Sequence, residues 1–315
     1  MILNNLDQHS EAKFKEFYDQ VIAQELNKIE LNRKSILKKF LICSSIGIPL
    51  ILISCFAIYW MCNFGNQYFY VEDPIIFLYF EVLLVILAVF FVKSIYHFPI
   101  AYKNSMKKSL LTSLLKFYGD FQFVNEKVDY SQLHSYRLFP RFDSIYNEDI
   151  LGGEYKGIAT KIIELVLTKS TSTRSFKYIF KGLFCTFGLN KRYNNHTIIL
   201  KNTDKIEVPI DFSELQTNNK EFNNQFKVLT DNRAEADSIL TPEFLNGLLE
   251  IKEKLQTTFR CGFYQGNFLF ALDTDKDFFE PTGIREGVLN DEKHTKILNE
   301  MNSILSIVDK LGLTQ

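Results

Sequence analysis

The sequence predicts an α+β fold: a transmembrane helical hairpin with long flanking helices, plus a cytoplasmic α+β domain with a mainly antiparallel sheet. Two observations predict it. Two long apolar runs stand in the first third of the chain, and from about Tyr146 short runs rich in Ile, Val, Phe and Leu alternate with turn residues. The hydrophobic content of 46% is ordinary for a globular protein. The prediction therefore rests on how unevenly the apolar residues are distributed.

Residues 1–39 are expected to form a cytoplasmic amphipathic helix that leads into the first apolar run. Its apolar side chains recur at helical spacing, at Phe14, Phe17, Tyr18, Val21, Ile22, Leu26 and Ile29. Residues 93–145 should hold a juxtamembrane helix and a linker, with a second stripe formed by Leu110, Leu111, Leu114 and Leu115. The two helices would pair as a stalk within one chain, or between chains as a coiled coil.

Residues 40–62 and 74–92 are the two predicted transmembrane helices. The first run has no charged residue, and its length on a helical rise is about 34 Å, enough to cross a hydrocarbon core. The second gives about 28 Å and carries one charge, Glu81. Mostly polar residues precede the first run and no small-residue cleavage site follows it, so we expect an anchor and no cleaved signal peptide.

Basic residues flank both runs, and the connection at residues 63–73 has none. The positive-inside rule therefore predicts a multi-pass inner-membrane protein, with both termini cytoplasmic and residues 63–73 outside. Five lysines are candidate contacts for anionic lipid headgroups: Lys38, Lys39, Lys93, Lys107 and Lys108. The alternative is that these charges set orientation only.

Glu81 is a carboxyl group in the outer half of the second run, and the matching depth on the first run falls near Ser54. Acidic side chains inside a membrane usually mark a functional contact. A proton relay needs several polar side chains in a row, and the second run has few besides Glu81. A contact with another helix or within an oligomer is therefore favoured over proton transfer as the role of Glu81. Glu81 and Ser54 are therefore the candidate intramembrane helix contact.

Residues 146–290 are expected to form the cytoplasmic α+β domain, and residues 291–315 a C-terminal amphipathic helix. Strands are predicted at 161–169, 177–188, 196–201, 205–210 and 225–229. Thr241 should cap a helix that begins at Pro242. Residues 265–267 should form the turn of a hairpin.

No linear pattern marks a catalytic, cofactor or metal site. The five cysteines lack CxxC spacing and are expected to be reduced and structural. Asp273, Asp275 and Asp277 lack the glycine and glutamate that a calcium loop needs. Gly152, Gly153 and Gly157 match no phosphate-binding motif and are expected to shape turns. A net charge of −1 gives no reason to expect nucleic acid as a partner.

A basic stretch around Lys169, Arg174, Lys177, Lys181, Lys191 and Arg192 lies among aromatic residues. It would face lipid headgroups or an acidic partner, or it would be a solvated sheet edge that the lysines protect. The last alternative is favoured.

The order of two apolar runs, "YNEDILGGEYKG", "FKGLF", "FKVLTDNRAEADSILTPEFLNGLLEI" and "FYQGNFLFALDTDKDFFEP" resembles bacterial membrane proteins with two transmembrane helices, catalogued as domain of unknown function 3137. The resemblance covers roughly Asn5 to Pro281 and is most specific at Phe226 to Leu249. It supports the architecture and implies no activity or catalytic residue.

Three function classes follow, in this order. The first is a membrane-anchored cytoplasmic binding or scaffold module, with the lipid bilayer and a protein partner or homo-oligomer as partners. The second is an oligomeric protein associated with transport or a channel, because two helices cannot enclose a pathway alone. The third is a membrane-tethered enzyme, which nothing in the linear sequence favours.

Overall fold

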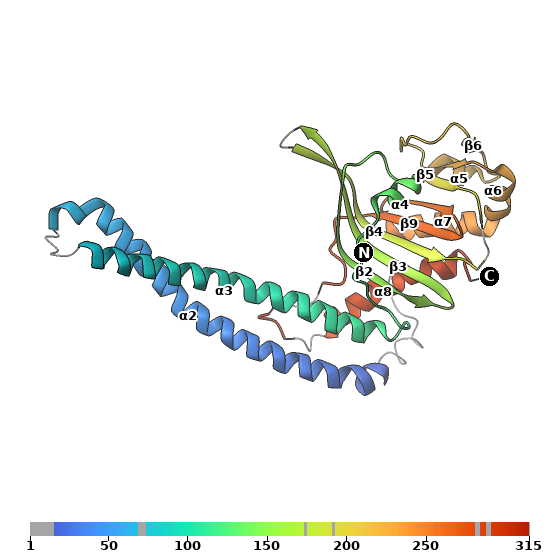
Figure 1. Cartoon of the computed structure of the whole chain (residues 1–315). Coiled ribbons are helices and arrows are strands. Elements are labelled where there is room, and N and C mark those ends of the chain that lie inside the picture. The colour runs from blue at the N-terminus through green and yellow to red at the C-terminus, as the bar shows by residue number, and fades with distance from the viewer. Residues whose placement is uncertain are drawn as a thin grey trace. The chain divides into compact units, whose positions relative to one another are not determined.

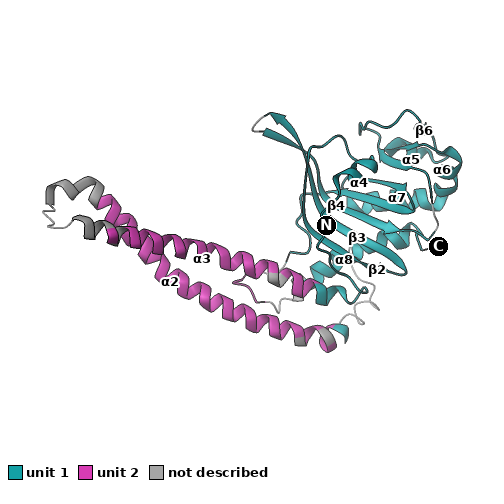
Figure 2. Ribbon diagram, in the orientation of Figure 1, with its two compact units in different colours: residues 1–17, 112–280, 294–315 teal, residues 18–111, 281–293 magenta. Residues whose placement is uncertain are grey.

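The computed structural model describes residues 16–68, 74–172, 175–190, 193–280, 284–287 and 291–314. The chain divides into two compact units (Figure 2). The helical unit comprises residues 18–111 and 281–293. The sheet unit comprises residues 1–17, 112–280 and 294–315. The chain therefore leaves the sheet unit after Glu280 and returns to it at His294.

Two long helices dominate the helical unit (Figure 1). A π-helical turn, η1 (Tyr18–Ile22), leads into α2 (Ala23–Tyr68), and α3 (Pro74–Leu115) follows. The two helices meet closely at Gly47, where an added Cβ atom would lie 2.7 Å from Cβ of Phe91. Glycine therefore permits the approach of α2 and α3 at this point.

Two stretches of these helices, Glu25–Trp60 and Val82–Leu115, are long and apolar enough to cross a membrane. In their most apolar windows only 11% and 0% of the residues are buried, whereas a core helix of a soluble protein is mostly buried. Large apolar side chains on both helices are instead exposed; Leu52 is 64% and Phe56 67% accessible.

The sheet unit contains a nine-stranded sheet, and every pairing in it is antiparallel. This confirms the predicted α+β class with an antiparallel sheet. In spatial order the strands are β1 (Gln122–Phe123), β2 (Ser144–Tyr155), β3 (Ile158–Ser172), β4 (Ser175–Gly188), β9 (Asn267–Asp273), β8 (Phe259–Tyr264), β5 (Thr197–Lys201), β7 (Phe226–Thr230) and β6 (Ser213–Leu215).

Other segments pack against both faces of the sheet. Adjacent residues of one strand point to opposite faces, so Phe184 and Cys185 lie on different sides. On one face Phe184 packs in a core with Leu133 of α4 (Tyr130–Ser135) and with the chain that follows α4. On the other face Cys185 lies among side chains of α7 (Pro242–Leu255) and α8 (Asp291–Lys310). The shorter helices are α5 (Lys220–Gln225) and α6 (Arg233–Ile239).

Local signals placed several elements correctly. The Thr241 hydroxyl accepts a hydrogen bond from the Phe244 amide at 3.2 Å, so it caps α7 as expected. Gln265 and Gly266 join β8 to β9 and have φ angles of 46° and 75°, as a two-residue hairpin turn with both central residues left-handed requires.

The strand predicted at residues 205–210 is wrong, because this segment is irregular. Ile206 and Val208 pack partly buried against the core without joining the sheet. The place beside β7 is taken by β6, which pairs through Ser213, Glu214 and Leu215. Pro209 also lacks the amide that a central strand must donate.

Candidate functional site

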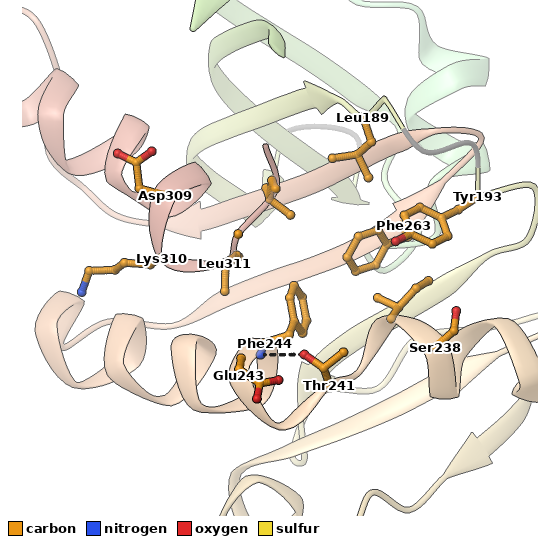
Figure 3. Close-up of a pocket in the computed structure, with 13 residues that line it drawn as sticks. Leu189, Tyr193, Ser238, Thr241, Glu243, Phe244, Phe263, Asp309, Lys310 and Leu311 are labelled. Atoms are coloured by element: carbon orange, nitrogen blue, oxygen red, sulfur yellow. Dashed lines mark hydrogen bonds between the residues drawn. The ribbon is translucent and has the colours of Figure 1, made fainter. Parts of the chain in front are cut away.

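A pocket of about 710 Å³ lies in the sheet unit, between the start of α7, strand β8 and the end of α8 (Figure 3). The N-terminal cap of α7 brings Thr241, Glu243 and Phe244 to one wall. The residues after α8, including Leu311 and Leu313, supply another wall. The pocket therefore joins three segments that are distant in sequence.

Aromatic rings form a further wall of this pocket. The ring of Phe263 lies 5.4 Å from that of Tyr193 and 5.5 Å from that of Phe244, centroid to centroid. Phe263 and Phe244 are buried. Offset and edge-to-face rings at this spacing make a stable apolar surface, which suits an apolar or aromatic group of a ligand.

Polar groups surround the aromatic wall. Asp309 is already engaged, because it accepts hydrogen bonds from Lys156 at 2.6 Å and from the Tyr155 hydroxyl at 3.0 Å. Lys310 extends away from the aromatic rings in Figure 3. The pKa of the Lys310 amino group is lowered to about 8, chiefly by burial and further by the nearby Lys254.

The chemistry of the pocket suits binding. Its described lining residues include the hydroxyl groups of Tyr193, Ser238 and Thr241 and the carboxylates of Glu243 and Asp309. No cysteine or histidine stands among them, and the Thr241 hydroxyl is occupied in capping α7.

A second pocket, of about 460 Å³, lies over β2, β3 and β4 and includes Gly152, Gly153 and Lys161. Lys161 pairs with Glu126 at 2.6 Å.

The expectation that Gly152 and Gly153 shape turns is wrong, since both lie within β2. An added Cβ would lie 2.7 Å from Val124 at Gly152 and 2.7 Å from Phe121 at Gly153, so they allow close packing beside β1. Gly157 does lie in the β2–β3 turn, with φ of 81°.

The segment "DTDKDFFE" is held by structural contacts. Asp273 accepts from Arg260, which also donates to Asp204 at 3.0 Å. The amide of Phe278 donates to Glu164 at 2.8 Å, and the amide of Phe279 donates to Glu300 at 2.9 Å. Burial raises the pKa of the Glu300 carboxyl above its ordinary value.

Ser54 and Glu81 are the candidate intramembrane helix contact, and the structure describes the side chain of Ser54 only. Ser54 is buried, and its hydroxyl donates to the Leu50 carbonyl at 2.9 Å. Glu81 lies in α3, but its side chain is outside the described residues. The contact between Ser54 and Glu81 stays a prediction.

The candidate headgroup lysines differ in exposure. Lys38 and Lys39 on α2 and Lys93 and Lys108 on α3 are exposed, and Lys107 is buried. Burial removes Lys107 from direct reach of a lipid headgroup. The other four remain available for such a contact.

The described cysteines are all free thiols. Cys185 and Cys261 are fully enclosed beside Phe270, which pairs with each of them across the sheet. Burial raises the pKa of both thiols well above the usual range. This agrees with the expected reduced, structural role; Cys62 lies outside the described side chains.

These features define an α+β unit with a fully antiparallel sheet and a binding-type pocket, next in the chain to two exposed apolar helices. Residues 178–313 match the family described as "Protein of unknown function (DUF3137)". This confirms the resemblance over its most specific part, which includes Phe226 to Leu249. The family description assigns no activity.

Other comparisons add little. No curated protein matches the chain. The crystal structure of the mycobacterial trehalose monomycolate transport factor A, TtfA, is similar at 12% sequence identity and a TM-score of 0.38; the match covers 64% of this chain and 93% of that chain. So slight a likeness transfers neither fold nor function.

Proposed function

We propose that this protein is a membrane-anchored binding module: α2 and α3 span a bacterial inner membrane as a hairpin, and the sheet unit binds a partner in the cytoplasm. The observation that carries the proposal is the apolar surface left uncovered along α2 and α3. In water such a surface would favour aggregation. In a bilayer it is matched to its surroundings, and all backbone groups of a helix are satisfied internally.

The lengths of the helices support this proposal. Residues 40–62 give about 34 Å on a helical rise, close to the thickness of a hydrocarbon core. Because α2 spans 46 residues, it would extend beyond the bilayer. The exposed Lys38, Lys39, Lys93 and Lys108 flank the apolar parts and would lie at the cytoplasmic headgroups.

The pocket at the start of α7 supports a binding role for the sheet unit. It combines a buried aromatic wall with hydroxyl groups at its rim. Pockets of a few hundred Å³ or more with this mixture commonly hold ligands or peptide side chains. The partner would place an apolar or aromatic group against Phe263 and Phe244.

Alkaline extraction and cysteine labelling test the anchor. The full chain should stay in membranes at high pH and leave only with detergent. In a chain lacking Cys43, Cys55 and Cys62, Gln67→Cys should react with a membrane-impermeant maleimide in right-side-out vesicles. Lys205→Cys should react only in inverted vesicles. Release by alkali, or the reverse labelling pattern, would refute the proposal.

Photo-crosslinking tests the binding role. A photoreactive phenylalanine analogue at Tyr193 should give a discrete crosslinked product in native membranes. The same analogue at Tyr146, an exposed tyrosine of β2 outside the pocket, is the matched control. Crowding the pocket with Ser238→Trp should abolish the product at Tyr193. Equal products at both positions would refute a role for the pocket.

A further inference from the structure

The end of the β3–β4 hairpin extends beyond the body of the sheet (Figure 1). Strand β9 pairs with β4 only between Gly182 and Gly188. Among the described residues, the part of β4 from Ser175 to Phe180 therefore has β3 as its strand partner and no strand on its other edge. The unpaired edge agrees with the solvated sheet edge expected from the sequence. Protection of such an edge by lysines does not explain why aromatic side chains are exposed there as well.

Two aromatic side chains are exposed on this projecting part. Phe176 is 60% and Tyr178 59% accessible, and their rings pack edge to face at 5.4 Å. They lie two residues apart in β4 and thus on one face of the hairpin. Exposed lysines protect a strand edge, whereas an exposed aromatic pair is a liability in water unless a partner covers it.

The opposite face concentrates positive charge. Lys169 of β3 lies directly across from Lys177 of β4, and both are exposed. Like charges in this cross-strand position repel one another. Residues 166–181 contain four basic residues, Lys169, Arg174, Lys177 and Lys181, and no acidic residue. Among the described residues neither Lys169 nor Lys177 has a carboxylate in ion-pair contact.

We propose that the described end of this hairpin, residues 168–172 and 175–178, docks on an anionic lipid surface, with Phe176 and Tyr178 entering the interface and Lys169 and Lys177 meeting lipid phosphates. Anionic headgroups would relieve the repulsion between the two lysines. Aromatic rings of this type prefer the boundary between water and hydrocarbon. The inference rests on the proposed function, because a chain anchored by α2 and α3 always has a bilayer within reach.

A single-tryptophan reporter tests the proposal in the full chain, which has one tryptophan, Trp60. Trp60→Phe with Phe176→Trp keeps an aromatic ring at the reporter position. The protein is reconstituted into vesicles of phosphatidylcholine alone or mixed with phosphatidylglycerol, in each case with brominated lipid as a contact quencher. We expect a blue-shifted and quenched emission with phosphatidylglycerol, and less of both with phosphatidylcholine alone.

Lysine variants separate docking from unspecific proximity. Lys169→Gln with Lys177→Gln should shift the docking equilibrium on anionic vesicles by roughly thirtyfold toward the undocked state. Lys205→Gln with Lys220→Gln removes the same charge from exposed sites elsewhere in the sheet unit and should change nothing. A reporter at the exposed Ile210 should stay accessible to iodide in both lipid mixtures.

Equal emission in the two lipid mixtures would overturn the proposal. So would a response that requires an added acidic protein instead of phosphatidylglycerol. Alkaline extraction of the same preparation reports the membrane anchor separately. A chain that resists extraction while the tryptophan reporter of the Phe176→Trp variant stays unresponsive would refute hairpin docking alone; a chain released by alkali would refute the anchor.

Discussion

The guanidinium group of Arg33 donates a hydrogen bond of 2.8 Å to the carbonyl oxygen of Ile284, which lies 251 residues further along the chain. The same group donates to both carboxylate oxygens of Glu30, at 2.8 and 2.6 Å. Arg33, Glu30 and Ile284 are all buried. Next to this contact the Arg285 guanidinium lies 5.9 Å from the centre of the Phe40 ring. Residues 284–287 are thereby held on α2.

Replacing Arg33 should loosen this attachment. Arg33→Gln removes the guanidinium group that donates to both oxygens of the buried Glu30 carboxylate, and breaking one side of a buried ion pair costs about 3–5 kcal/mol. We expect a lower midpoint of thermal unfolding in mild detergent and faster proteolysis at residues 284–287. Lys34→Gln, at an exposed position 3.8 Å from Glu30, is the control and should have little effect. Equal effects of the two substitutions would contradict this role.

Gly182 should not tolerate a side chain. Its φ angle is 152°, and an added Cβ would lie 2.0 Å from the Leu272 carbonyl oxygen on the neighbouring strand. Gly182→Ala must therefore shift the backbone, and we expect a loss of at least about 1–3 kcal/mol in unfolding free energy. Gly188→Ala in the same strand meets an ordinary contact of 3.4 Å and is the control. Denaturant unfolding of both variants measures the difference.

Stability should depend on pH through Glu300. Burial raises the pKa of its carboxyl above the ordinary value of 4.5, so the folded chain binds this proton more tightly than the unfolded chain. The destabilisation is absent below the unfolded pKa and develops as pH rises through the folded pKa. Glu300→Gln should flatten this part of the curve while still accepting from the Phe279 amide. Thermal unfolding measured from pH 4 to 8, compared with Glu292→Gln at an exposed site of α8, checks it.

The contact of Gly47 with Phe91 should set the spacing of α2 and α3. Gly47→Leu adds a side chain where even a Cβ atom would lie 2.7 Å from Phe91. Overpacking of this kind costs about 1–3 kcal/mol. The midpoint of unfolding in detergent should fall, and Phe91→Ala should restore part of it. Failure of the second substitution to compensate would show that the two residues act independently.

Cys185 and Cys261 should resist thiol reagents until the sheet opens. Both are fully buried, and their raised pKa values leave little thiolate at neutral pH. In the native full chain, maleimide labelling at these positions should follow the rate of unfolding in denaturant. The exposed Cys55 is an internal control in detergent. Labelling of Cys185 as fast as that of Cys55 would contradict the burial.

Elements with strong local signals were predictable from the sequence. The Thr241-Pro242 start of α7 and the Gln265-Gly266 turn each depend on a few neighbouring residues. The prediction of a strand at 205–210 was wrong although apolar and polar residues alternate there. The edge of β7 is already paired with β6, so this segment has no place in the sheet beside β7. Strands β1 and β6 span two and three residues, which is too short for a period-two pattern.

The candidate pocket was not predictable. Tyr193, Phe244 and Phe263 come from three separate segments, and each reads alone as an ordinary aromatic residue of a strand or helix. Only the sheet order places β8 beside the start of α7. The ion pair of Glu30 with Arg33 follows helical spacing and could have been found, but its bond to Ile284 depends on the return of a distant segment.

In the sequence, α8 is separated from the rest of the sheet unit by residues 281–293. The parts of the sheet unit are therefore synthesised at different times. Leu298, Met301, Leu305 and Val308 of α8 are fully buried, so the part of the sheet unit that α8 covers stays open until α8 has been synthesised. The apolar helices α2 and α3 precede α8 in the chain and are synthesised far earlier. A nascent chain arrested before residue 294 should therefore hold an open sheet that chaperones recognise, with its two apolar helices already complete.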